Sequence, residues 1–405
     1  MTQQIQKQPS SFLLGHVAPV LSLDSRDWML ASGSEDKTCR IWDLRTDKVH
    51  KALRGFEDPV TTTTFTPADS HTIYVGTGDK IYTYDLRMES LLLETAQSTR
   101  VYDGAQDEIN QVSSITGTCL AACDDAGDVR VLDLKTQKWM RSLERQHDNI
   151  AMAVQFVPKK DLQALSGGMD KQIVAWDFYK GRPTQLIDTD TPAPAGVQSK
   201  QLFNPPFVHS IAIHPSGTRA AIGLGDGTIQ FLNTAADTPS APQQRDESTS
   251  TAPAVSKKSK KKAAGSSDKG ADGWMVGGRL NEAHGTPIAT IEYAGFNPDW
   301  LVTSASNGTI AVWDEQAARY SSLRQQDRLQ ELQKQQLQHP QEDVTLPYGR
   351  SLEPLQEFRV TEAFERINCI TTTKASEGEK RVFVAGTHAR AGDPRLQGRI
   401  AIYQL

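Results

Sequence analysis

Cysteine is scarce in this chain of 405 residues. Its four cysteines, Cys39, Cys119, Cys123 and Cys369, are too few and too scattered for a disulfide framework. Cys119 and Cys123 lie close together, but no second pair of Cys or His residues completes a zinc site. We therefore expect four buried thiols in a reducing compartment, and no metal or other cofactor.

Long apolar runs are missing too. No stretch approaches the ~18 apolar residues of a membrane span. Residues 1–10 are rich in Gln and have no apolar core, so they predict a flexible N-terminus rather than a secretory signal. The chain has 44 basic and 49 acidic residues, a net charge of −5, which argues against a protein that coats nucleic acid. The expected partners are other proteins, away from the membrane.

The motifs of common enzyme classes are also absent. There is no P-loop, no dinucleotide-binding glycine fingerprint, no His-Glu-x-x-His and no Gly-x-Ser-x-Gly. The glycines within residues 223–227 suit a strand–turn–strand element rather than a phosphate cradle. His388, Arg390, Asp393 and Arg395 gather in one loop, which a solvated surface explains more simply than an active site. We predict that the chain is not an enzyme.

What the chain does contain is a repeat with a period of about 40–45 residues. Three copies are clear, and each has a His, a turn of small polar residues and a closing Trp-Asp. They run from His16 to Asp43, from His147 to Asp177 and from His284 to Asp314. Four weaker copies close at Asp85, Asp133, Asn233 and Tyr403. Short runs of Val, Ile, Thr and Ala between Gly, Asp and Asn turns predict strands.

The Gly-His pair, the later Trp-Asp pair and this period resemble the WD40 family, in which each repeat forms a four-stranded propeller blade. The resemblance implies an all-β, seven-bladed WD40 β-propeller over residues 11–405, most simply a monomer. Residues 11–14 precede the first Gly-His, and no residues follow Leu405 to supply another strand. We therefore expect an N-terminal strand to complete the last blade and close the ring, which removes exposed sheet edges.

The resemblance also implies a buried hydrogen-bonded set of His, Ser or Thr, Asp and Trp in each clear repeat. The sets are His16, Ser32, Asp36 and Trp42; His147, Ser166, Asp170 and Trp176; and His284, Thr303, Asn307 and Trp313. Asn307 replaces the aspartate in the third set. A buried carboxylate must be paired, and such a chain pairs it. Ser, His and Asp also make up hydrolase triads, but repetition of the set before Trp-Asp favours a structural role. The other blades lack the set, so we expect apolar packing to hold them.

A first insertion interrupts blade 5. Residues 234–272 consist mainly of Thr, Ala, Ser, Pro, Gln and Lys without an aromatic residue, which predicts a disordered segment. It contains Lys257, Lys258, Lys260, Lys261 and Lys262, which suit either a nuclear-import signal or a solvated charge run. Without interleaved aromatic residues these lysines argue against specific base recognition. We expect residues 274–278 to resume the outer strand.

A second insertion spans residues 315–357. Residues 315–338 are rich in Gln, Leu, Arg and Glu without Pro or Gly, which predicts a solvated helix that ends before Pro340. Its leucines form no continuous heptad seam, which argues against a coiled coil. Residues 341–357 are predicted to be a loop that precedes the last blade.

Two adjacent repeats close with Asp-x-Arg, and the third has Lys in the last place. Paired endings of this kind resemble the motif of substrate receptors for cullin-4 RING ubiquitin ligases. In that family the two arginines contact the propeller adaptor of the ligase, the damage-specific DNA-binding protein subunit one. The adaptor-binding residues that the resemblance implies are Trp42, Asp43, Arg45, Asp85 and Arg87. A guanidinium suits planar, bidentate contacts. The alternative is that both arginines are ordinary surface residues.

Phrases outside the generic repeat, such as residues 124–134 and 202–211, resemble a poorly characterised group of WD-repeat proteins proposed as receptors of the same ligases. We therefore predict a non-catalytic interaction scaffold of the nucleus, the cytoplasm or both. It would recruit an unidentified client, bound at the narrow face around the central channel, to a ubiquitin ligase. The alternative is a nuclear scaffold for chromatin or ribosome assembly, in which the lysine run matters and the arginines are incidental.

Overall fold

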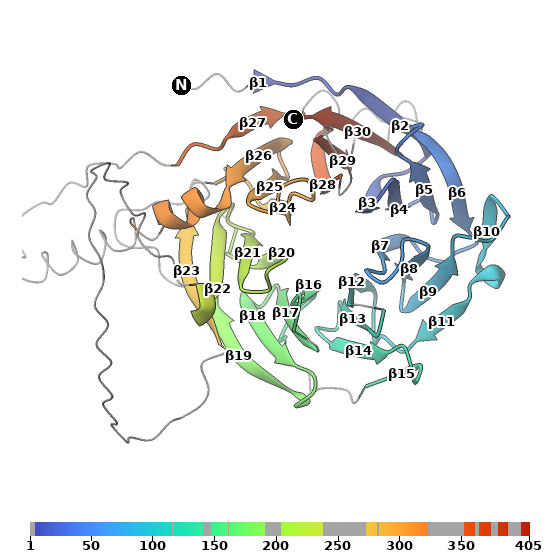
Figure 1. Cartoon of the computed structure of the whole chain (residues 1–405), viewed down its shortest axis with the longest axis horizontal. Coiled ribbons are helices and arrows are strands. Elements are labelled where there is room, and N and C mark those ends of the chain that lie inside the picture. The colour runs from blue at the N-terminus through green and yellow to red at the C-terminus, as the bar shows by residue number, and fades with distance from the viewer. Residues whose placement is uncertain are drawn as a thin grey trace, which may run out of the picture.

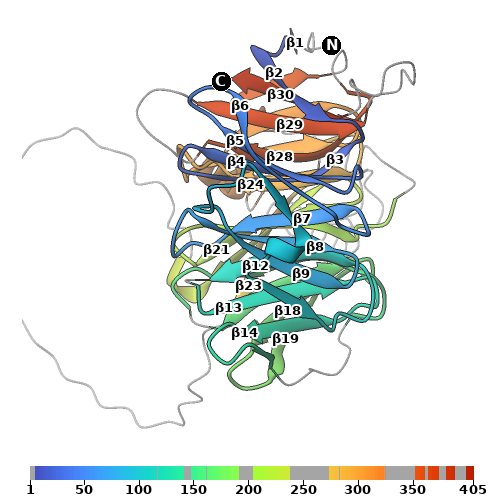
Figure 2. The same cartoon turned by 90° about the vertical axis from the view of Figure 1, so that its right-hand side faces the viewer.

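The computed structural model describes residues 5–115, 117–140, 147–160, 162–190, 204–237, 273–281, 283–322, 324, 352–360, 364–373, 380–387 and 398–405. Its strands form seven antiparallel sheets arranged as blades in a ring (Figure 1). Figure 2 shows the ring edge-on, with the strands running across its thickness from one face to the other. The predicted seven-bladed propeller is confirmed.

Each blade is built from four successive positions, from an inner strand at the channel to an outer strand at the rim. Blade 1 contains β3 (Val20–Arg26), β4 (Met29–Ser34), β5 (Cys39–Asp43) and β6 (Lys48–Arg54). Blade 2 contains β7 (Val60–Phe65), β8 (Thr72–Thr77), β9 (Lys80–Asp85) and β11 (Arg100–Asp103). Blade 3 contains β12 (Ile109–Ile115), β13 (Cys119–Asp124), β14 (Val129–Asp133) and β15 (Lys138–Trp139). Blade 4 contains β16 (Ala151–Phe156), β17 (Gln163–Gly168), β18 (Gln172–Asp177) and β19 (Arg182–Asp188).

The remaining blades follow the same order. Blade 5 contains β20 (Val208–Ile213), β21 (Arg219–Leu224), β22 (Ile229–Thr234) and β23 (Trp274–Leu280). Blade 6 contains β24 (Ile288–Tyr293), β25 (Trp300–Ala305), β26 (Thr309–Asp314) and β27 (Gln356–Arg359). Blade 7 contains β28 (Arg366–Thr372), β29 (Arg381–Thr387), β30 (Gly398–Gln404) and β2 (Ser11–His16). The helical elements are η1 (Thr95–Gln97), η2 (Ala235–Asp237) and a helix over residues 315–322.

The N-terminal strand closes the ring, as predicted. β2 pairs antiparallel with β30, with Ser11 opposite Ile402 and Leu13 opposite Ile400. Two short strands give blades 1 and 6 a fifth strand beyond the expected four. β10 (Leu92–Glu94) pairs in parallel with β6 of blade 1. β1 (Ile5–Gln6), which lies in the segment expected to be flexible, pairs in parallel with β27 of blade 6.

Apolar side chains fill the space between neighbouring blades. Buried Ile41 and Tyr84 belong to a cluster that joins blades 1 and 2, and Val312 and Val384 belong to one that joins blades 6 and 7. Each such side chain contributes roughly 1.5–3 kcal/mol when fully buried. Close approach of the blades also requires glycine in the second strand, because a Cβ at Gly33 would lie 2.5 Å from Val60 Cγ1.

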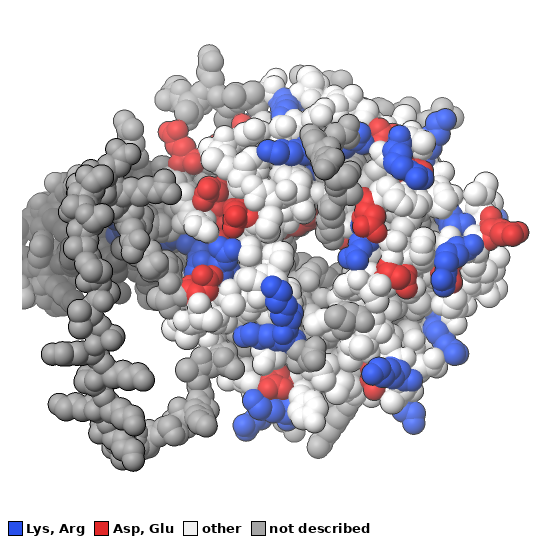
Figure 3. All heavy atoms as spheres, in the orientation of Figure 1, with Lys and Arg blue, Asp and Glu red and all other residues white. Residues whose placement is uncertain are grey.

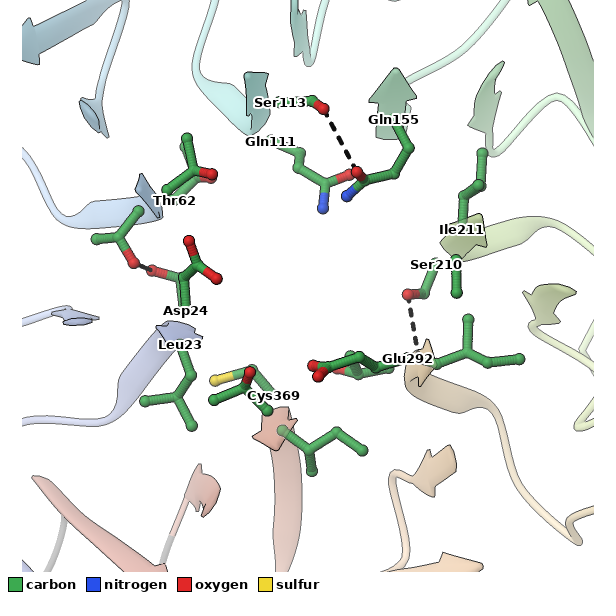
Figure 4. A pocket seen from close by; sticks show the side chains of 18 of the residues that line it. Leu23, Asp24, Thr62, Gln111, Ser113, Gln155, Ser210, Ile211, Glu292 and Cys369 are labelled. Atoms are coloured by element: carbon green, nitrogen blue, oxygen red, sulfur yellow. Dashed lines mark hydrogen bonds between the residues drawn. The ribbon is translucent and has the colours of Figure 1, made fainter. Parts of the chain in front are cut away.

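Polar side chains of the inner strands join the blades around a channel of about 740 Å³ (Figure 4). Each inner strand pairs with the second strand of its own blade, and its other edge has no partner strand in that sheet. The edge N–H groups of Phe65, Val112, Phe156, Ile291 and Thr372 donate to Asp24 (2.7 Å), Thr62 (3.2 Å), Ser113 (3.1 Å), Ser210 (3.2 Å) and Glu292 (3.2 Å). The polar lining of the channel therefore has a structural role, because buried backbone donors must be satisfied.

Antiparallel hairpins place the connections between strands on alternate faces of the ring. In blades 1 to 6 the first-to-second and third-to-fourth connections emerge on one face, and the second-to-third connections on the other; in blade 7 the fourth strand comes from the other end of the chain. We call the first of these faces the hairpin face. Both insertions leave from it, after β22 in blade 5 and after β26 in blade 6.

The second insertion differs from its predicted form in two ways. It lies inside blade 6, before the outer strand β27, and the predicted loop therefore ends earlier than residue 357. The described part of its helix is also packed rather than solvated, since Ala318, Arg319 and Ser322 are buried. Residues 325–351 and 238–272, which include most of both insertions, lie outside the described residues.

Candidate protein-interaction face

The first Asp-x-Arg motif forms a tight turn on the hairpin face. Asp43 ends β5, and its Oδ1 accepts the backbone N–H of Arg45 at 2.9 Å. The guanidinium of Arg45 then closes on the same carboxylate, with Nε at 2.9 Å from Oδ1 and Nη2 at 2.6 Å from Oδ2. It also lies over the ring of Trp28, 4.2 Å from the centroid. The side chain of Arg45 nevertheless stays 64% exposed.

The second motif repeats this geometry on the next blade. Asp85 Oδ1 accepts the backbone N–H of Arg87 at 3.0 Å and the side-chain Nε at 2.9 Å. Nη2 of Arg87 lies 2.7 Å from Asp85 Oδ2, and the side chain is 68% exposed. The structure thus brings the four predicted charged residues onto one face as two matching pairs.

Buried residues between the partners fix both turns. Leu44 and Leu86, each between an Asp and its Arg, are 7% and 4% exposed. Their N–H groups donate to the carbonyls of Trp28 (2.8 Å) and His71 (2.7 Å) in the first hairpin of the same blade. The leucine anchors the turn, and the arginine is left at its tip.

The electrostatics of the pairs follow from this geometry. The hydrogen bond from Arg45 lowers the pKa of Asp43, and that from Arg87 lowers the pKa of Asp85. Both carboxylates are therefore ionised at neutral pH. A bidentate contact through Nε and Nη2 leaves Nη1 of each guanidinium directed away from the carboxylate, as an edge of N–H donors.

Trp42 departs from its predicted role as an adaptor contact. Its side chain is 1% exposed, so it cannot touch a partner. Its indole N–H donates to Ser32 Oγ at 2.8 Å, and it packs in the cluster that joins blades 7 and 1. The tryptophan of the Trp-Asp pair therefore has a structural role, because Trp42 is the last buried residue before the exposed turn.

The His, Ser, Asp and Trp residues of blade 1 form one chain of hydrogen bonds. The indole of Trp42 donates to Ser32 Oγ, which lies 2.8 Å from His16 Nε2. His16 Nδ1 lies 2.9 Å from Asp36 Oδ2. Since Ser32 accepts from Trp42, its hydroxyl donates to Nε2, and the proton of the imidazole is on Nδ1, facing the aspartate. Because these four side chains are buried, their hydrogen bonds stabilise the blade, and they include no exposed nucleophile.

Blades 4 and 6 contain the corresponding sets. In blade 4, Ser166 Oγ accepts from Trp176 at 2.8 Å and lies 2.8 Å from His147 Nε2, and His147 Nδ1 lies 3.0 Å from Asp170 Oδ2. In blade 6, Thr303 Oγ1 lies 2.7 Å from His284 Nε2 and 2.9 Å from Trp313 Nε1. Asn307 accepts the N–H of Thr309 at 3.1 Å and completes the turn without a charge.

Comparison with known proteins agrees with this architecture. Residues 7–43, the repeat with the complete hydrogen-bonded set of blade 1, match the model of the WD domain, G-beta repeat (WD40). The chain is a seven-bladed propeller whose first repeat matches the WD40 model. It is 32% identical over 234 residues to the WD repeat-containing protein 53 homolog of Dictyostelium discoideum, covering 54% of this chain and 62% of that protein. The predicted resemblance to a narrower group of WD-repeat proteins is thereby confirmed.

Other relatives match shorter parts of the chain. Human Protein NEDD1 is 24% identical over 217 residues, 53% of this chain and 30% of that protein. Human Kinesin-like protein KIF21B is 31% identical over 137 residues, 30% of this chain and 8% of that protein. The chain thus spans less than two thirds of each of these relatives.

Polar contacts add to the apolar packing that we expected in blade 5. Its apolar side chains, Ile222 and Leu232 among them, pack in a buried cluster with those of blade 4. Arg279 Nη2 also lies 2.5 Å from Asp226, and its Nε donates to Thr228 Oγ1 at 3.0 Å. A second buried cluster joins Arg219 of blade 5 to Glu315 of blade 6 at 2.6 Å. Acidic residues and arginines far apart in the sequence carry no spacing signal, so the sequence predicts neither contact.

The cysteines of the propeller are buried free thiols, as expected. Burial raises the pKa of Cys39, Cys123 and Cys369, which makes them inert. Among the described residues there is no group of His, Cys, Asp or Glu that could hold a metal ion, and no helix there is long and apolar enough to cross a membrane. The lysine run at 257–262 and the residues from His388 to Arg395 lie outside the described residues.

Charges of both signs are spread over the face of the propeller that Figure 3 shows. On the face seen in Figure 3, basic and acidic side chains are interspersed around the rim. This distribution favours recognition through individual placed groups over long-range attraction by a patch of one sign. The two exposed arginine–aspartate pairs are such groups.

Proposed function

We propose that this WD40 propeller is a non-catalytic scaffold that serves as a substrate receptor of a cullin-4 RING ubiquitin ligase and binds the propeller adaptor through Arg45 and Arg87. One observation carries the proposal: two guanidinium groups on adjacent blades have the same bidentate geometry and are 64% and 68% exposed. The same local turn holds both side chains, so that adjacent blades present two guanidinium groups in the same way.

Preorganisation supports this proposal. A free arginine side chain loses about 2 kcal/mol of rotamer entropy when it is fixed. Here Asp43 and Asp85 already hold the side chains, so binding requires little further ordering. The outward N–H edge of each guanidinium would donate to carboxylate or carbonyl oxygens of the adaptor. The client would bind elsewhere, at the face around the central channel.

The test is a binding measurement with purified adaptor and the full chain. Arg45→Ala/Arg87→Ala should lose binding by about 1,000-fold, because each arginine at the centre of an interface is worth roughly 2 kcal/mol or more. Arg54→Ala is the matched control. Arg54 is also exposed and paired with a carboxylate, Glu94 at 2.7 Å, but it lies at the opposite end of the blade.

Wild-type chain that does not bind the adaptor would overturn the proposal, as would a double variant that binds like the wild type. In cells, the same three proteins used as baits should separate cullin-4 components from clients. The double variant loses the ligase and retains the clients.

The proposed nuclear location rests on the lysine run at 257–262, and a deletion separates the two scaffold hypotheses. If the chain is a ligase receptor, deleting 257–262 shifts its distribution toward the cytoplasm and leaves adaptor binding intact. A nuclear assembly scaffold would instead lose its partners with the deletion and keep them in the arginine double variant.

A further inference from the structure

The turn that presents Arg45 and Arg87 recurs in blades 3 and 4. In blade 3, Asp133 Oδ1 accepts the N–H of Lys135 at 2.8 Å, and the N–H of Leu134 donates to the Thr118 carbonyl at 2.9 Å. In blade 4, the N–H of Phe178 donates to the Leu162 carbonyl at 2.9 Å. Four successive blades therefore place the second residue after their aspartate at equivalent positions on the hairpin face.

These four positions define an arc, which consists of Arg45, Arg87, Lys135 and Tyr179. All four side chains are exposed. Beyond blade 4 the arc ends, because blade 5 continues into η2 and blade 6 into the helix over residues 315–322. The arc thus continues the proposed adaptor surface over two further blades.

Tyr179 is the aromatic member of the arc. It is 87% exposed, the highest value among the large hydrophobic side chains of the described residues. The neighbouring Phe178 packs for the turn: it is 6% exposed and stacks on Trp176 with ring centroids 5.5 Å apart. Asp177 stabilises the turn by accepting the N–H of Lys180 at 3.1 Å. An aromatic ring held at the tip of a fixed turn provides a large contact area at a small entropic cost.

We propose that the adaptor surface which binds Arg45 and Arg87 extends over blades 3 and 4, where Lys135 faces an acidic group and Tyr179 inserts its ring into an apolar pocket of the same partner. This inference rests on the proposed function and adds an apolar contact at the blade 4 end of the arc. The arc contains three cations and one aromatic ring, so the complementary surface has carboxylates beside an apolar recess. Tyr and Arg are the residue types that dominate binding energy at interfaces.

The test compares adaptor affinity between variants of the full chain. Tyr179→Ala should weaken binding about 30-fold, the effect of a typical aromatic hot spot. Tyr179→Phe should stay within about threefold, because the ring supplies most of the contact. Leu186→Ala is the control: Leu186 is 57% exposed in β19 of the same blade, away from the turn. Thermal midpoints of all variants should match the wild type, since both positions are exposed.

Lys135→Ala gives a second readout. It should slow association by about threefold at low salt and have no effect at high salt, as expected for a charge at the rim of an interface.

The outcomes distinguish the two proposals. If Tyr179→Ala binds like the wild type while Arg45→Ala/Arg87→Ala does not bind, the arc is not an extended interface and the receptor proposal stands. If the wild type itself does not bind the adaptor, both proposals are wrong. If Tyr179→Ala and Leu186→Ala weaken binding equally, the effect does not belong to the arc and the inference fails.

Discussion

The aspartate that closes the third strand acts differently in blades 1 and 6. Asp43 accepts the N–H of the residue two positions later, which makes a turn that presents Arg45 to solvent. Asp314 accepts the N–H of Ala317, three positions later, at 2.8 Å, and so caps the helix that begins there. The same residue type at the same place in a blade either presents an arginine to solvent or starts an insertion.

The residue after this aspartate accounts for the difference. In every blade the N–H at this position donates to a carbonyl of the first hairpin. The donors are Leu44, Leu86, Leu134, Phe178, Thr234, Glu315 and Leu405, and the acceptors are Trp28, His71, Thr118, Leu162, Thr218, Asp299 and Lys380. The position is apolar in blades 1 to 4, but blade 6 has Glu315, which is fully buried.

Arginines make this buried carboxylate tolerable. Arg219 lies 2.6 Å from Glu315, and Arg319, one helical turn later, lies 3.5 Å from it. Burial raises the pKa of Glu315, and the two arginines oppose that shift. The same burial, with Arg219 nearby, lowers the pKa of His214 to about 4, so His214 is neutral beside the cluster. Blade 6 thus uses a charge cluster to attach its helix, where blade 1 uses a leucine to anchor an exposed turn.

Removing one arginine should destabilise the protein through the charge cluster of blade 6, whereas a change at the equivalent position of blade 2 should have a small effect. Arg219→Met leaves Glu315 buried with only Arg319 beside it, which should lower the free energy of unfolding by about 3–5 kcal/mol. Urea unfolding followed by tryptophan fluorescence measures this. Leu86→Met, at the equivalent position of blade 2, should lower it by less than about 1.5 kcal/mol.

A double variant separates the charge effect from a general loss of packing. Arg219→Met/Glu315→Met should recover most of the lost stability, because well-packed apolar residues replace a buried ion pair with little loss. An Arg219→Met protein as stable as the wild type would show that Glu315 does not depend on this pair.

Replacing the aspartate of the hydrogen-bonded set in blade 1 by the asparagine found in blade 6 should lower stability by a smaller amount, and this loss should depend on pH. Asp36→Asn copies Asn307 and replaces a carboxylate that accepts from His16, Val17 and Thr38. We expect a loss of about 2 kcal/mol at pH 7, the value of a buried hydrogen bond to a charged group.

The pKa of Asp36 sets the range over which this difference changes. Burial alone would raise the pKa of Asp36. Hydrogen bonds from His16 and Thr38 outweigh this effect and lower the pKa to about 2, below the ordinary value of 3.8. The stability that the carboxylate contributes is therefore complete above its ordinary pKa of 3.8 and is lost as the pH falls through about 2. Thermal midpoints of the two proteins should converge in this range. A gap that stays constant from pH 6 to pH 3 would contradict the assignment of the charge to Asp36.

Most of the fold can be predicted from the sequence repeat. Trp-Asp endings, Gly-rich turns and the apolar run at Leu13 predict the blades and the closing strand, because local turn chemistry and strand pairing determine them. The contact between Arg219 and Glu315 could not be predicted, because it joins residues of two blades by charge alone. The sequence does not single out Tyr179 for a related reason: the role that we propose for it depends on its alignment with Arg45 and Arg87, and only the equivalent turns of the structure reveal that alignment.

The smallest expected effect concerns blade 3, where lysine takes the position that arginine has in blades 1 and 2. Lys135 shares the backbone contact of Arg45 and Arg87, and that N–H bond lowers the pKa of Asp133. A lysine ammonium cannot make the two parallel bonds of a guanidinium. Lys135→Arg should add them, lowering the pKa of Asp133 further in an NMR titration. Because the pair is exposed, the thermal midpoint should not change measurably.

Adaptor affinity should rise by no more than about threefold in Lys135→Arg, since the charge was already present and only its fixation is new. Lys135→Gln removes the charge and keeps the length of the side chain approximately, so it should lower affinity at low salt alone. A pKa of Asp133 that does not respond to the arginine would show that the turn of blade 3 differs from those of blades 1 and 2. The arc would then have a gap between Arg87 and Tyr179, and contact with a single continuous partner surface would be harder to maintain.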